Sequence, residues 1–253
     1  VQGQERVYHV DPWLDGGLIL GGTGAFVFAR RIQNDRPQLS MEDVRRLGDH
    51  DVPWYDRSAL RIDPEQQRSA MLLSDIGLYG SMAAPALLFL DPKVRAEWGS
   101  VLTLYIETAA IASGSQAWAC LGTGRYRPIT YIPEASWTQR LDRRNSNSFY
   151  SGHTGNAAMA TFFMAKVYSD MHPELGAKRW WLFGAAAIPP ALTGYTRVLA
   201  GKHFPSDVVA GFLVGAAQGV LVPHLHKRWP GSPVSLLPTV FPDAVGMQLS
   251  VKW

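Results

Sequence analysis

Two stretches of the sequence, SFYSGHT at residues 148–154 and TRVLAGKHFPSDVVAG at residues 196–211, decide how the rest of the chain is interpreted. Apolar residues follow the first stretch at helical spacing, from Ala157 to Val167, so Ser151 and Gly152 fall at a helix N-terminus. In the second stretch, Pro205 suits the first position of a helix, because its missing N–H leaves no donor unpaired. The sequence therefore predicts two helix starts, each accompanied by a histidine.

The residue types around the second helix start are those of a reactive imidazole. His203 would lie just before the helix and Asp207 in its first turn, where an acidic side chain can reach back toward the entering chain. Asp207 is therefore expected to accept a hydrogen bond from one ring nitrogen of His203. That bond would fix the tautomer and leave the other nitrogen basic, as a nucleophile requires.

The first helix start and two arginines are suited to an anion. Free backbone N–H groups at Ser151 and Gly152 favour negative charge, and His153 is positioned to give a proton to a leaving oxygen. Arg127 and Arg197 can each donate two hydrogen bonds to phosphate oxygens. Each motif alone also fits an ordinary helix cap or a solvated surface charge, so the interpretation depends on their order and spacing together.

Composition limits the classes of function. Charged residues make up 18% of the 253 residues, below the ~25% of a typical soluble domain. With 9 Trp and 9 Tyr, this favours either contact with lipid or an unusually large core. The net charge of +3 lacks the concentrated basic stripe of a nucleic-acid-binding protein. Cys120 is the only cysteine, so no intrachain disulfide can form.

The apolar runs at residues 76–90, 180–196 and 208–223 are shorter than the ~20 residues of a membrane-spanning helix. They are expected to be buried bundle helices, with peripheral membrane contact allowed and a polytopic protein as the alternative. The chain begins at Val1 rather than Met, and removal of a signal peptide is the favoured explanation. The expected location is the cell envelope, periplasmic or secreted, with membrane association allowed.

The sequence predicts a single all-α domain over residues 1–253, with a short C-terminal β segment. Residues 1–14 are expected to be irregular and anchored by Trp13, and residues 122–147 to form a loop. In the tail at 229–253, alternating residues predict a strand at 245–253, paired with 236–241 if a hairpin forms. Long helices are expected at residues 16–31, 68–90, 93–121, 151–170, 177–199 (kinked at Pro189 and Pro190) and 205–225.

The combined pattern resembles the type 2 phosphatidic acid phosphatase (PAP2) superfamily, which also contains bacterial acid phosphatases and vanadium haloperoxidases. The family pattern is Lys-x6-Arg-Pro, then Pro-Ser-Gly-His, then Ser-Arg-x5-His-x3-Asp. Here the corresponding segments are CLGTGRYRP at 120–128, YSGH at 150–153 and TRVLAGKHFPSD at 196–207. The resemblance covers residues 120–207 directly, and residues 208–211 with the flanking helices extend it over about half of the chain. It implies a helical bundle of the PAP2/haloperoxidase type over the core at residues 120–211.

The resemblance implies a role for each matched residue. His203 corresponds to the nucleophile that forms a phosphohistidine, Asp207 to its orienting carboxylate and His153 to the general acid. The oxyanion cradle corresponds to Arg127, Arg197, Ser151 and Gly152. Hydrolysis in this family needs no metal or cofactor, and in the haloperoxidase branch vanadate occupies the phosphate site.

Three positions depart from the family pattern. Tyr150 replaces proline, Thr196 replaces serine but keeps the hydroxyl, and Cys120 falls where the family has lysine. The cradle therefore lacks one positive charge, for which Arg125 and Lys202 are the candidate substitutes. A cysteine nucleophile is disfavoured, because it requires Cys-x5-Arg, whereas Arg125 and Arg127 follow Cys120 at other spacings.

The leading hypothesis is a phosphatase acting on a phosphate monoester or diphosphate, with an amphiphilic lipid or prenyl substrate favoured. The alternatives are a vanadium haloperoxidase and a catalytically altered protein that binds a phosphorylated ligand. No metal site is predicted. The sequence leaves the physiological substrate and the oligomeric state open. The other histidines lack metal-ligand spacing and are predicted to be surface or capping residues: His9, His50, His172, His224 and His226.

Overall fold

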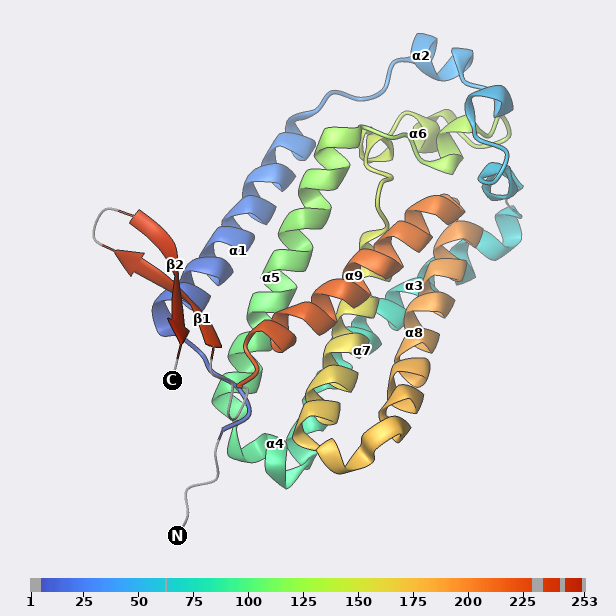
Figure 1. The fold of residues 1–253 in the computed structure, drawn as a ribbon. Helices are drawn as coiled ribbons and strands as arrows, with labels where there is room; N and C mark the ends of the chain where they lie inside the picture. Colours follow the sequence, from blue (N-terminus) through green and yellow to red (C-terminus); the bar gives the residue numbers. More distant parts are fainter. Residues whose placement is uncertain (1–5, 62, 229–233, 242–243, 252–253) are drawn as a thin grey trace.

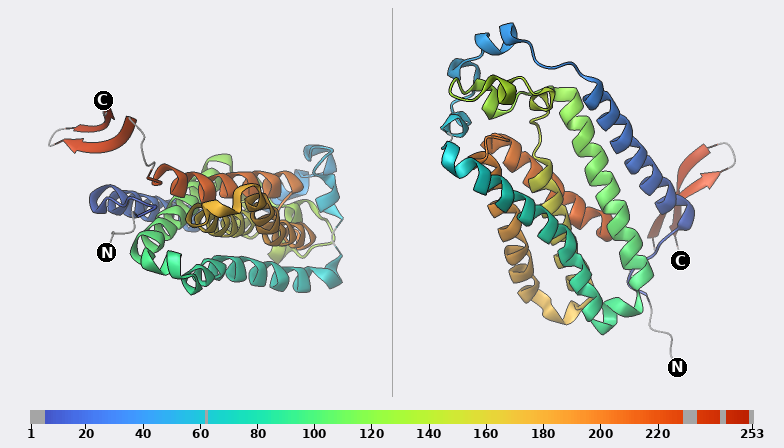
Figure 2. Two further views of the ribbon diagram at one scale, coloured as in Figure 1. Left: turned by 60° about the horizontal axis from the view of Figure 1, so that its bottom comes forward. Right: turned by 180° about the vertical axis from the view of Figure 1, so that it is seen from behind.

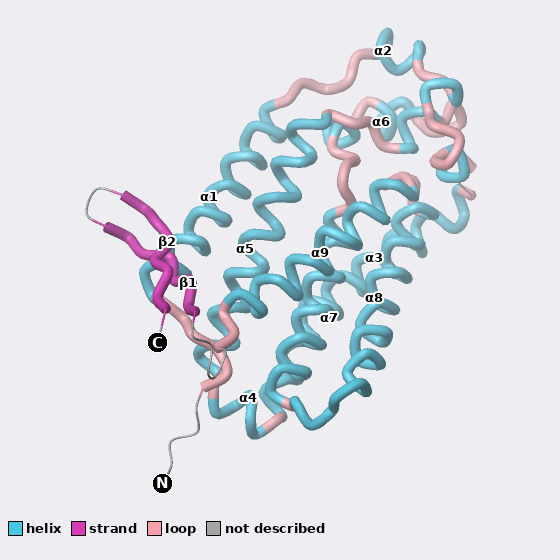
Figure 3. Tube along the Cα trace, in the orientation of Figure 1, coloured by secondary structure: helices cyan, strands magenta, loops and turns pink. Residues whose placement is uncertain are grey.

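The computed structural model describes residues 6–61, 63–228, 234–241 and 244–251. Helices dominate it, which confirms the all-α prediction (Figures 1 and 3). The long helices are α1 (Pro12–Asp35), α3 (Pro64–Ala83), α5 (Trp98–Thr123), α7 (Gly152–Met171), α8 (Arg179–Leu199) and α9 (Pro205–Leu225). The short helices are α2 (Met41–Arg46), α4 (Pro92–Ala96) and α6 (Trp137–Arg140).

Helix α7 forms the centre of the bundle and packs against α3, α5, α8 and α9, while α1 packs along α5 (Figure 2). The side chains of α7 explain this position, since Phe163 and Val167 are fully buried and join a core cluster with Leu104 and Val101 of α5. The long helices place their ends at two ends of the bundle. One end carries α6 and the loop before α7, and the other carries α4 (Figure 1).

Helix α1 begins earlier than the sequence predicts. Asp11 caps it by accepting hydrogen bonds from the backbone N–H groups of Trp13 and Leu14, and Pro12 occupies the first turn. Residues 12–14 are therefore helical rather than irregular. Trp13 is 87% exposed, so it does not anchor this segment by packing into the core of the protein.

The second and third predicted helices are each divided in the structure. The helix α3 ends at Ala83, and a 3-10 segment continues over Ala84–Leu90, because Pro85 cannot donate a backbone hydrogen bond. The predicted helix at 93–121 is split into α4 and α5 at Glu97. Helix α5 ends at Thr123, and its C-cap is Gly124, whose φ of 56° is a conformation that glycine adopts without strain.

Helices α7 and α9 lie in unusually close contact. A Cβ atom at Gly215 would lie 2.0 Å from the backbone oxygen of Gly155, so this crossing requires a residue without a side chain. The backbone N–H of Ser151 also donates to the carbonyl of Asp207 at 3.0 Å. The starts of α7 and α9 are therefore side by side, which brings the two motif stretches together.

The C-terminal strands β1 (Val234–Phe241) and β2 (Ala244–Val251) form a two-stranded antiparallel sheet. Val234 pairs with Val251 at one end of the ladder, and Phe241 pairs with Ala244 at the other. Both strands lie outside the helical bundle (Figures 1 and 2).

The apolar runs expected to be buried are largely exposed. Two helical segments of the described chain, Gln66–Leu90 and Pro205–Leu225, are long and apolar enough to cross a membrane. In the most apolar 18-residue stretch of each segment, only 22% and 28% is buried inside the protein. The prediction of buried bundle helices is therefore wrong for these two segments. Apolar composition could not distinguish the two cases, because a helix that faces lipid and a helix that faces a protein core are equally apolar.

Candidate active site

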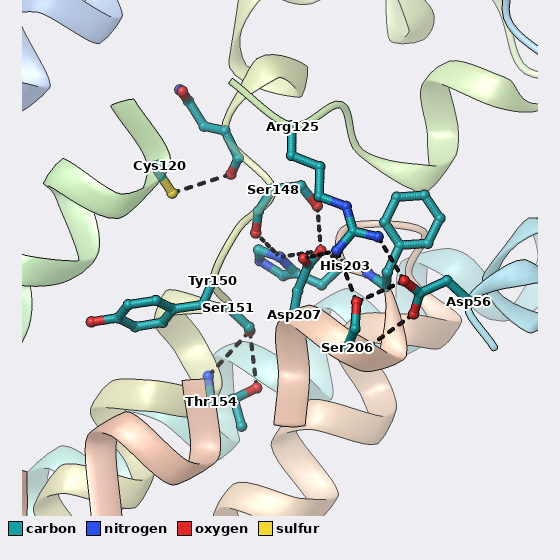
Figure 4. A network of polar contacts seen from close by, with 12 residues as sticks. Asp56, Cys120, Arg125, Ser148, Tyr150, Ser151, Thr154, His203, Ser206 and Asp207 are labelled. Atoms are coloured by element: carbon teal, nitrogen blue, oxygen red, sulfur yellow. Dashed lines mark hydrogen bonds and ion pairs between the residues drawn. The ribbon is translucent and has the colours of Figure 1, made fainter. Parts of the chain in front are cut away.

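The loop between α5 and α7 folds back onto the starts of α7 and α9. It is held there by backbone hydrogen bonds, from Ser148 N to Arg125 O at 3.0 Å and from Arg127 N to Asn145 O at 2.8 Å. Figure 4 shows Ser148, Arg125, His203 and Asp207 meeting at this point. The three matched sequence segments thus converge at one end of the bundle.

His203 is buried and its tautomer is fixed by the loop. Its Nδ1 lies 2.8 Å from the carbonyl oxygen of Ser148. A carbonyl only accepts hydrogen bonds, so Nδ1 carries the proton and Nε2 keeps a lone pair. Burial, which outweighs the opposing contact with Asp207, lowers the pKa of His203 to about 3. The ring is therefore neutral near pH 7, the state required of a nucleophile.

Asp207 contacts His203 less directly than the sequence predicts. Its Oδ2 lies 3.8 Å from His203 Nδ1, beyond hydrogen-bond distance. Oδ2 instead accepts from Ser148 Oγ at 2.5 Å and from Phe204 N at 3.0 Å. The predicted hydrogen bond is thus replaced by one from His203 to the Ser148 carbonyl. Asp207 therefore holds the side chain of Ser148, whose carbonyl binds the ring, and the backbone of Phe204, which follows His203.

Arg125 forms ion pairs with two carboxylates and is therefore not available to bind an anion. Its two terminal nitrogens donate to Asp207 Oδ1 and to Asp56 Oδ2, both at 2.6 Å (Figure 4). Its guanidinium also stacks over the ring of Phe204 at 4.4 Å. Two carboxylates already balance this charge, so Arg125 is a poor substitute for the missing lysine.

His153 lies in the first turn of α7 and meets α3. Its Nε2 is 2.9 Å from Oδ1 of Asp75, which comes from α3. Burial, followed by the charge of Arg197, lowers the pKa of His153 to about 4, although the contact with Asp75 opposes this shift. Arg197 and Arg127 also lower the pKa of His203. Both imidazoles therefore experience the charges of the same two arginines.

Arg127 and Arg197 each contain a buried donor with no hydrogen-bond partner among the described residues. In both side chains the unpaired atom is Nε. Burial, followed by the charge of Arg127, lowers the pKa of Arg197 to about 10. Unpaired buried donors are rare, because each forfeits its hydrogen bonds to water. An anion between the two guanidinium groups would satisfy both donors and relieve their mutual repulsion.

Lys202 adds a third positive charge to this region. Burial, and then the charges of Arg127 and Arg197, lower the pKa of Lys202 to about 8. Its backbone N–H donates to the carbonyl of Arg197 at 3.1 Å. Lys202 therefore interacts electrostatically with Arg127 and Arg197, whereas Arg125 is ion-paired with Asp56 and Asp207. Of the two candidate substitutes for the family lysine, Lys202 fits better.

Ser151 and Gly152 form the start of α7, as predicted. Ser151 is the N-cap, and its Oγ accepts from the backbone N–H of Thr154 at 3.4 Å. A Cβ atom at Gly152 would lie 3.0 Å from the side-chain amide carbon of Gln116. The small size of Gly152 therefore makes room for Gln116 on α5, a constraint that the sequence did not indicate.

Cys120 is buried beside the loop rather than poised for attack. Its Sγ accepts from Gln116 Nε2 at 3.0 Å and donates to the carbonyl of Asn147 at 3.5 Å. Burial raises the pKa of the thiol, although Arg127 opposes the shift. A thiol held protonated is a weak nucleophile, so this geometry agrees with the sequence argument against a cysteine phosphatase.

Sequence reasoning missed Asp75 and Gln116. Asp75 is a carboxylate on an otherwise apolar stretch of α3, and this isolation is a signal that could have been noticed. Gln116 also binds the carbonyl of Tyr150 at 3.1 Å, so it supports the residue that replaces the family proline. Nothing in the local sequence of Gln116 distinguishes it from other residues of α5.

Fold and site together define a helical-bundle protein whose two histidines and clustered cations lie at one end of the bundle. The sequence model of the PAP2 superfamily matches residues 101–230, just over half of the 253 residues. The chain therefore belongs to the PAP2 superfamily, as the sequence resemblance predicted.

Two curated relatives are similar over parts of their length. Lipid A 1-phosphatase of Porphyromonas gingivalis is 32% identical over 129 residues, which cover 51% of this chain and 23% of that protein. Phosphatidylglycerophosphatase B of Bacillus subtilis is 32% identical over 88 residues, which cover 35% of this chain and 43% of that protein. The chain thus matches less than half the length of either relative.

A solved structure is also similar, namely the crystal structure of the first transmembrane PAP2 type phosphatidylglycerolphosphate phosphatase from Bacillus subtilis. It is 21% identical, with a TM-score of 0.46, and the match covers 80% of this chain and 94% of that chain.

Proposed function

We propose that this protein is a phosphatase that hydrolyses a phosphate monoester or diphosphate of a lipid through a phosphohistidine intermediate. The observation that carries the proposal is the pair of buried Nε donors on Arg127 and Arg197, neither of which has a hydrogen-bond partner in the described part of the chain. A phosphoryl group has oxygens for both, and charge-assisted hydrogen bonds to phosphate are among the stronger ones in proteins. Lys202 supplies a third positive charge nearby.

In the proposed first step, Nε2 of His203 attacks phosphorus and the bond from phosphorus to the leaving oxygen breaks. The lone pair on Nε2 is available because Nδ1–H donates to the Ser148 carbonyl. His153 gives its proton to the leaving oxygen. In the second step water attacks the phosphohistidine, His153 takes a proton from that water, and Nε2 is released with inorganic phosphate.

Asp75 would orient His153 and favour its protonated form. The Nε2 to Oδ1 contact of 2.9 Å supports this role, since a carboxylate stabilises an imidazolium. Arg197 acts in the opposite direction and keeps the pKa of His153 low. A bound phosphate dianion would offset the guanidinium charge, so His153 would become a proton donor when substrate is present.

A lipid substrate is supported by an apolar pocket of about 560 Å³ between α8 and α9. It includes Pro205, two residues after His203, and is suited to an acyl or prenyl chain whose phosphate reaches the site. The relatives' names specify lipid A and phosphatidylglycerophosphate. The other lining residues are Ser58, Ala191, Tyr195, Val198, Leu199, Val208, Val209, Phe212 and Leu213.

We further propose that the protein is associated with a membrane of the cell envelope. The exposed apolar segments Gln66–Leu90 and Pro205–Leu225 support this location, because a folded protein rarely leaves such surface in water.

The test is a phosphate-release screen across phosphatidylglycerophosphate, lipid A, prenyl diphosphates and soluble monoesters. We expect release from at least one lipid phosphate, and none from the His203→Ala variant. A matched control is His224→Ala, an exposed histidine at the other end of α9. Wild-type activity in His203→Ala would contradict the mechanism. Binding without turnover of any substrate would favour a phosphate-ligand binder instead.

A further inference from the structure

A second group of chemistry-bearing side chains lies at the other end of the bundle from the candidate active site. Asp15 is in the first turn of α1, Glu107 is on α5, and His226 directly follows α9. In Figure 1 the start of α1 and the end of α9 lie away from α6 and the loop before α7. This group therefore belongs to a different part of the protein from His203 and His153.

The three side chains converge on one point. His226 Nε2 lies 3.0 Å from Asp15 Oδ1 and 3.7 Å from Glu107 Oε2, and the three donor atoms all lie within 4.8 Å of one another. Ligands of a tetrahedral zinc ion, each about 2.0–2.1 Å from the metal, are about 3.3 Å apart. The two nitrogen–oxygen separations differ from that spacing by only a few tenths of an ångström.

The tautomer of His226 is the one that a metal ligand needs. Its Nδ1 lies 2.8 Å from the carbonyl oxygen of Val222, which can only accept, so Nδ1 carries a proton. The lone pair of Nε2 then faces two carboxylates. Such an arrangement requires a positive charge between them, either a second proton on the ring or a bound cation. An imidazole held by a backbone carbonyl is a common support for metal ligation.

Glu107 provides an independent sign that a ligand is missing. The residue is 1% exposed, and its Oε2, directed at the cluster, is buried without a hydrogen-bond partner among the described residues. By contrast, Asp15 Oδ2 is satisfied by the backbone N–H of Asp11 at 2.7 Å. Burying a carboxylate oxygen without a partner is costly unless a cation or donor reaches it.

We propose that Asp15, Glu107 and His226 form a binding site for a divalent transition-metal ion, with Zn²⁺ as the best fit. Two carboxylates and one imidazole suit Zn²⁺ better than Mg²⁺ or Ca²⁺, which prefer oxygen ligands throughout. Three protein ligands leave a further position for water. The ion would join α1 to α5 and to the end of α9, so it would stabilise the bundle at this end.

The test is metal binding by the whole protein in detergent, measured after treatment with a chelator and dialysis. Zn²⁺ is titrated into the wild type, Glu107→Gln and His226→Ala, with His224→Ala as the control for surface histidines. We expect one Zn²⁺ per wild-type chain, with affinity lowered at least about a hundredfold in the first two variants. The affinity of His224→Ala should equal that of the wild type.

Equal Zn²⁺ affinity in all four proteins would overturn the proposal, because binding would then be adventitious. Absence of saturable binding to the wild type would also overturn it, and would leave a protonated His226 between the two carboxylates. Should the two ligand variants fail to fold, Co²⁺ added to the wild type decides. Intense visible absorption of four-coordinate Co²⁺ supports the site, and the weak spectrum of hydrated Co²⁺ contradicts it. Neither readout depends on phosphate release.

Discussion

His153 offers the sharpest test at the scale of single residues, because its proposed task depends on the substrate. An alkyl phosphate needs a proton on its leaving oxygen, whereas nitrophenolate leaves without one. We expect His153→Ala to lower alkyl phosphate turnover by about 10²–10⁴-fold, the usual contribution of a general acid, and nitrophenyl phosphate turnover far less. Steady-state rates on both substrates check this, with exposed His50→Ala as the control. Equal losses on both would remove His153 from the acid role.

The pH dependence follows from the lowered pKa of His153. An acid catalyst must be protonated, and His153 is protonated only below its pKa of about 4 in the absence of a bound anion. The ratio of alkyl to nitrophenyl kcat/KM should therefore fall as the pH rises above about 4. His203, with a pKa of about 3, is already neutral throughout this range.

The pH above which the alkyl to nitrophenyl ratio falls should be higher when kcat values are compared instead of kcat/KM values. The parameter kcat/KM reports the free enzyme and kcat the substrate complex, in which the phosphate charge raises the pKa of His153. The ratio should become independent of pH in His153→Ala. A ratio independent of pH in the wild type would contradict the assignment.

Lys202 is expected to supply the positive charge that the family places at position 120, where this chain has Cys120. Removing one charge-assisted hydrogen bond costs about 1.5–3 kcal/mol, so Lys202→Ala should weaken vanadate inhibition by roughly ten- to a hundredfold. Adding Cys120→Lys to that variant should restore part of the inhibition, since the thiol lies within the field of Arg127. Exposed Lys178→Ala is the control. Unchanged inhibition in Lys202→Ala would show that this lysine does not face the anion.

At the scale of elements, the contact between α7 and α9 positions both motif stretches. The Cβ of an alanine at position 215 would lie 2.0 Å from the carbonyl oxygen of Gly155. We expect Gly215→Ala to destabilise the fold by about 1–3 kcal/mol, although alanine is the better helix former. Denaturant unfolding measures this effect. Gly184→Ala on α8, where no atom lies within 4 Å, should be neutral or stabilising. Equal stability of the two variants would contradict the close packing.

For the whole molecule, the exposed apolar surface predicts stable attachment to lipid. Leu72 on α3 and Leu192 on α8 are 62% and 61% exposed. We expect the protein to float with phosphatidylglycerol-containing vesicles and to remain bound in high salt, because apolar burial is not screened by ions. The double variant Leu72→Glu, Leu192→Glu should bind less, whereas Met41→Glu on α2 should not. A protein that stays monomeric in water and does not bind vesicles would contradict this prediction.

The sequence by itself determined the helical class, the approximate extent of the long helices and the family. Helical periodicity, N-caps and prolines act between residues close in the chain, so Ser151 and Pro205 mark helix starts wherever those helices pack. The order and spacing of the motifs identified the family before any contact was known. The catalytic roles of His203, His153 and Asp207 stay predictions, as does the envelope location.

Only the tertiary structure decided which side chains meet across the bundle. The partner of His153 is Asp75, 78 residues away, and the partner of His226 is Asp15, 211 residues away. The fold also directed Arg125 to Asp56 and Asp207, and left the apolar faces of α3 and α9 exposed. Such contacts depend on how whole helices pack, and residue spacing along the chain carries no record of that packing.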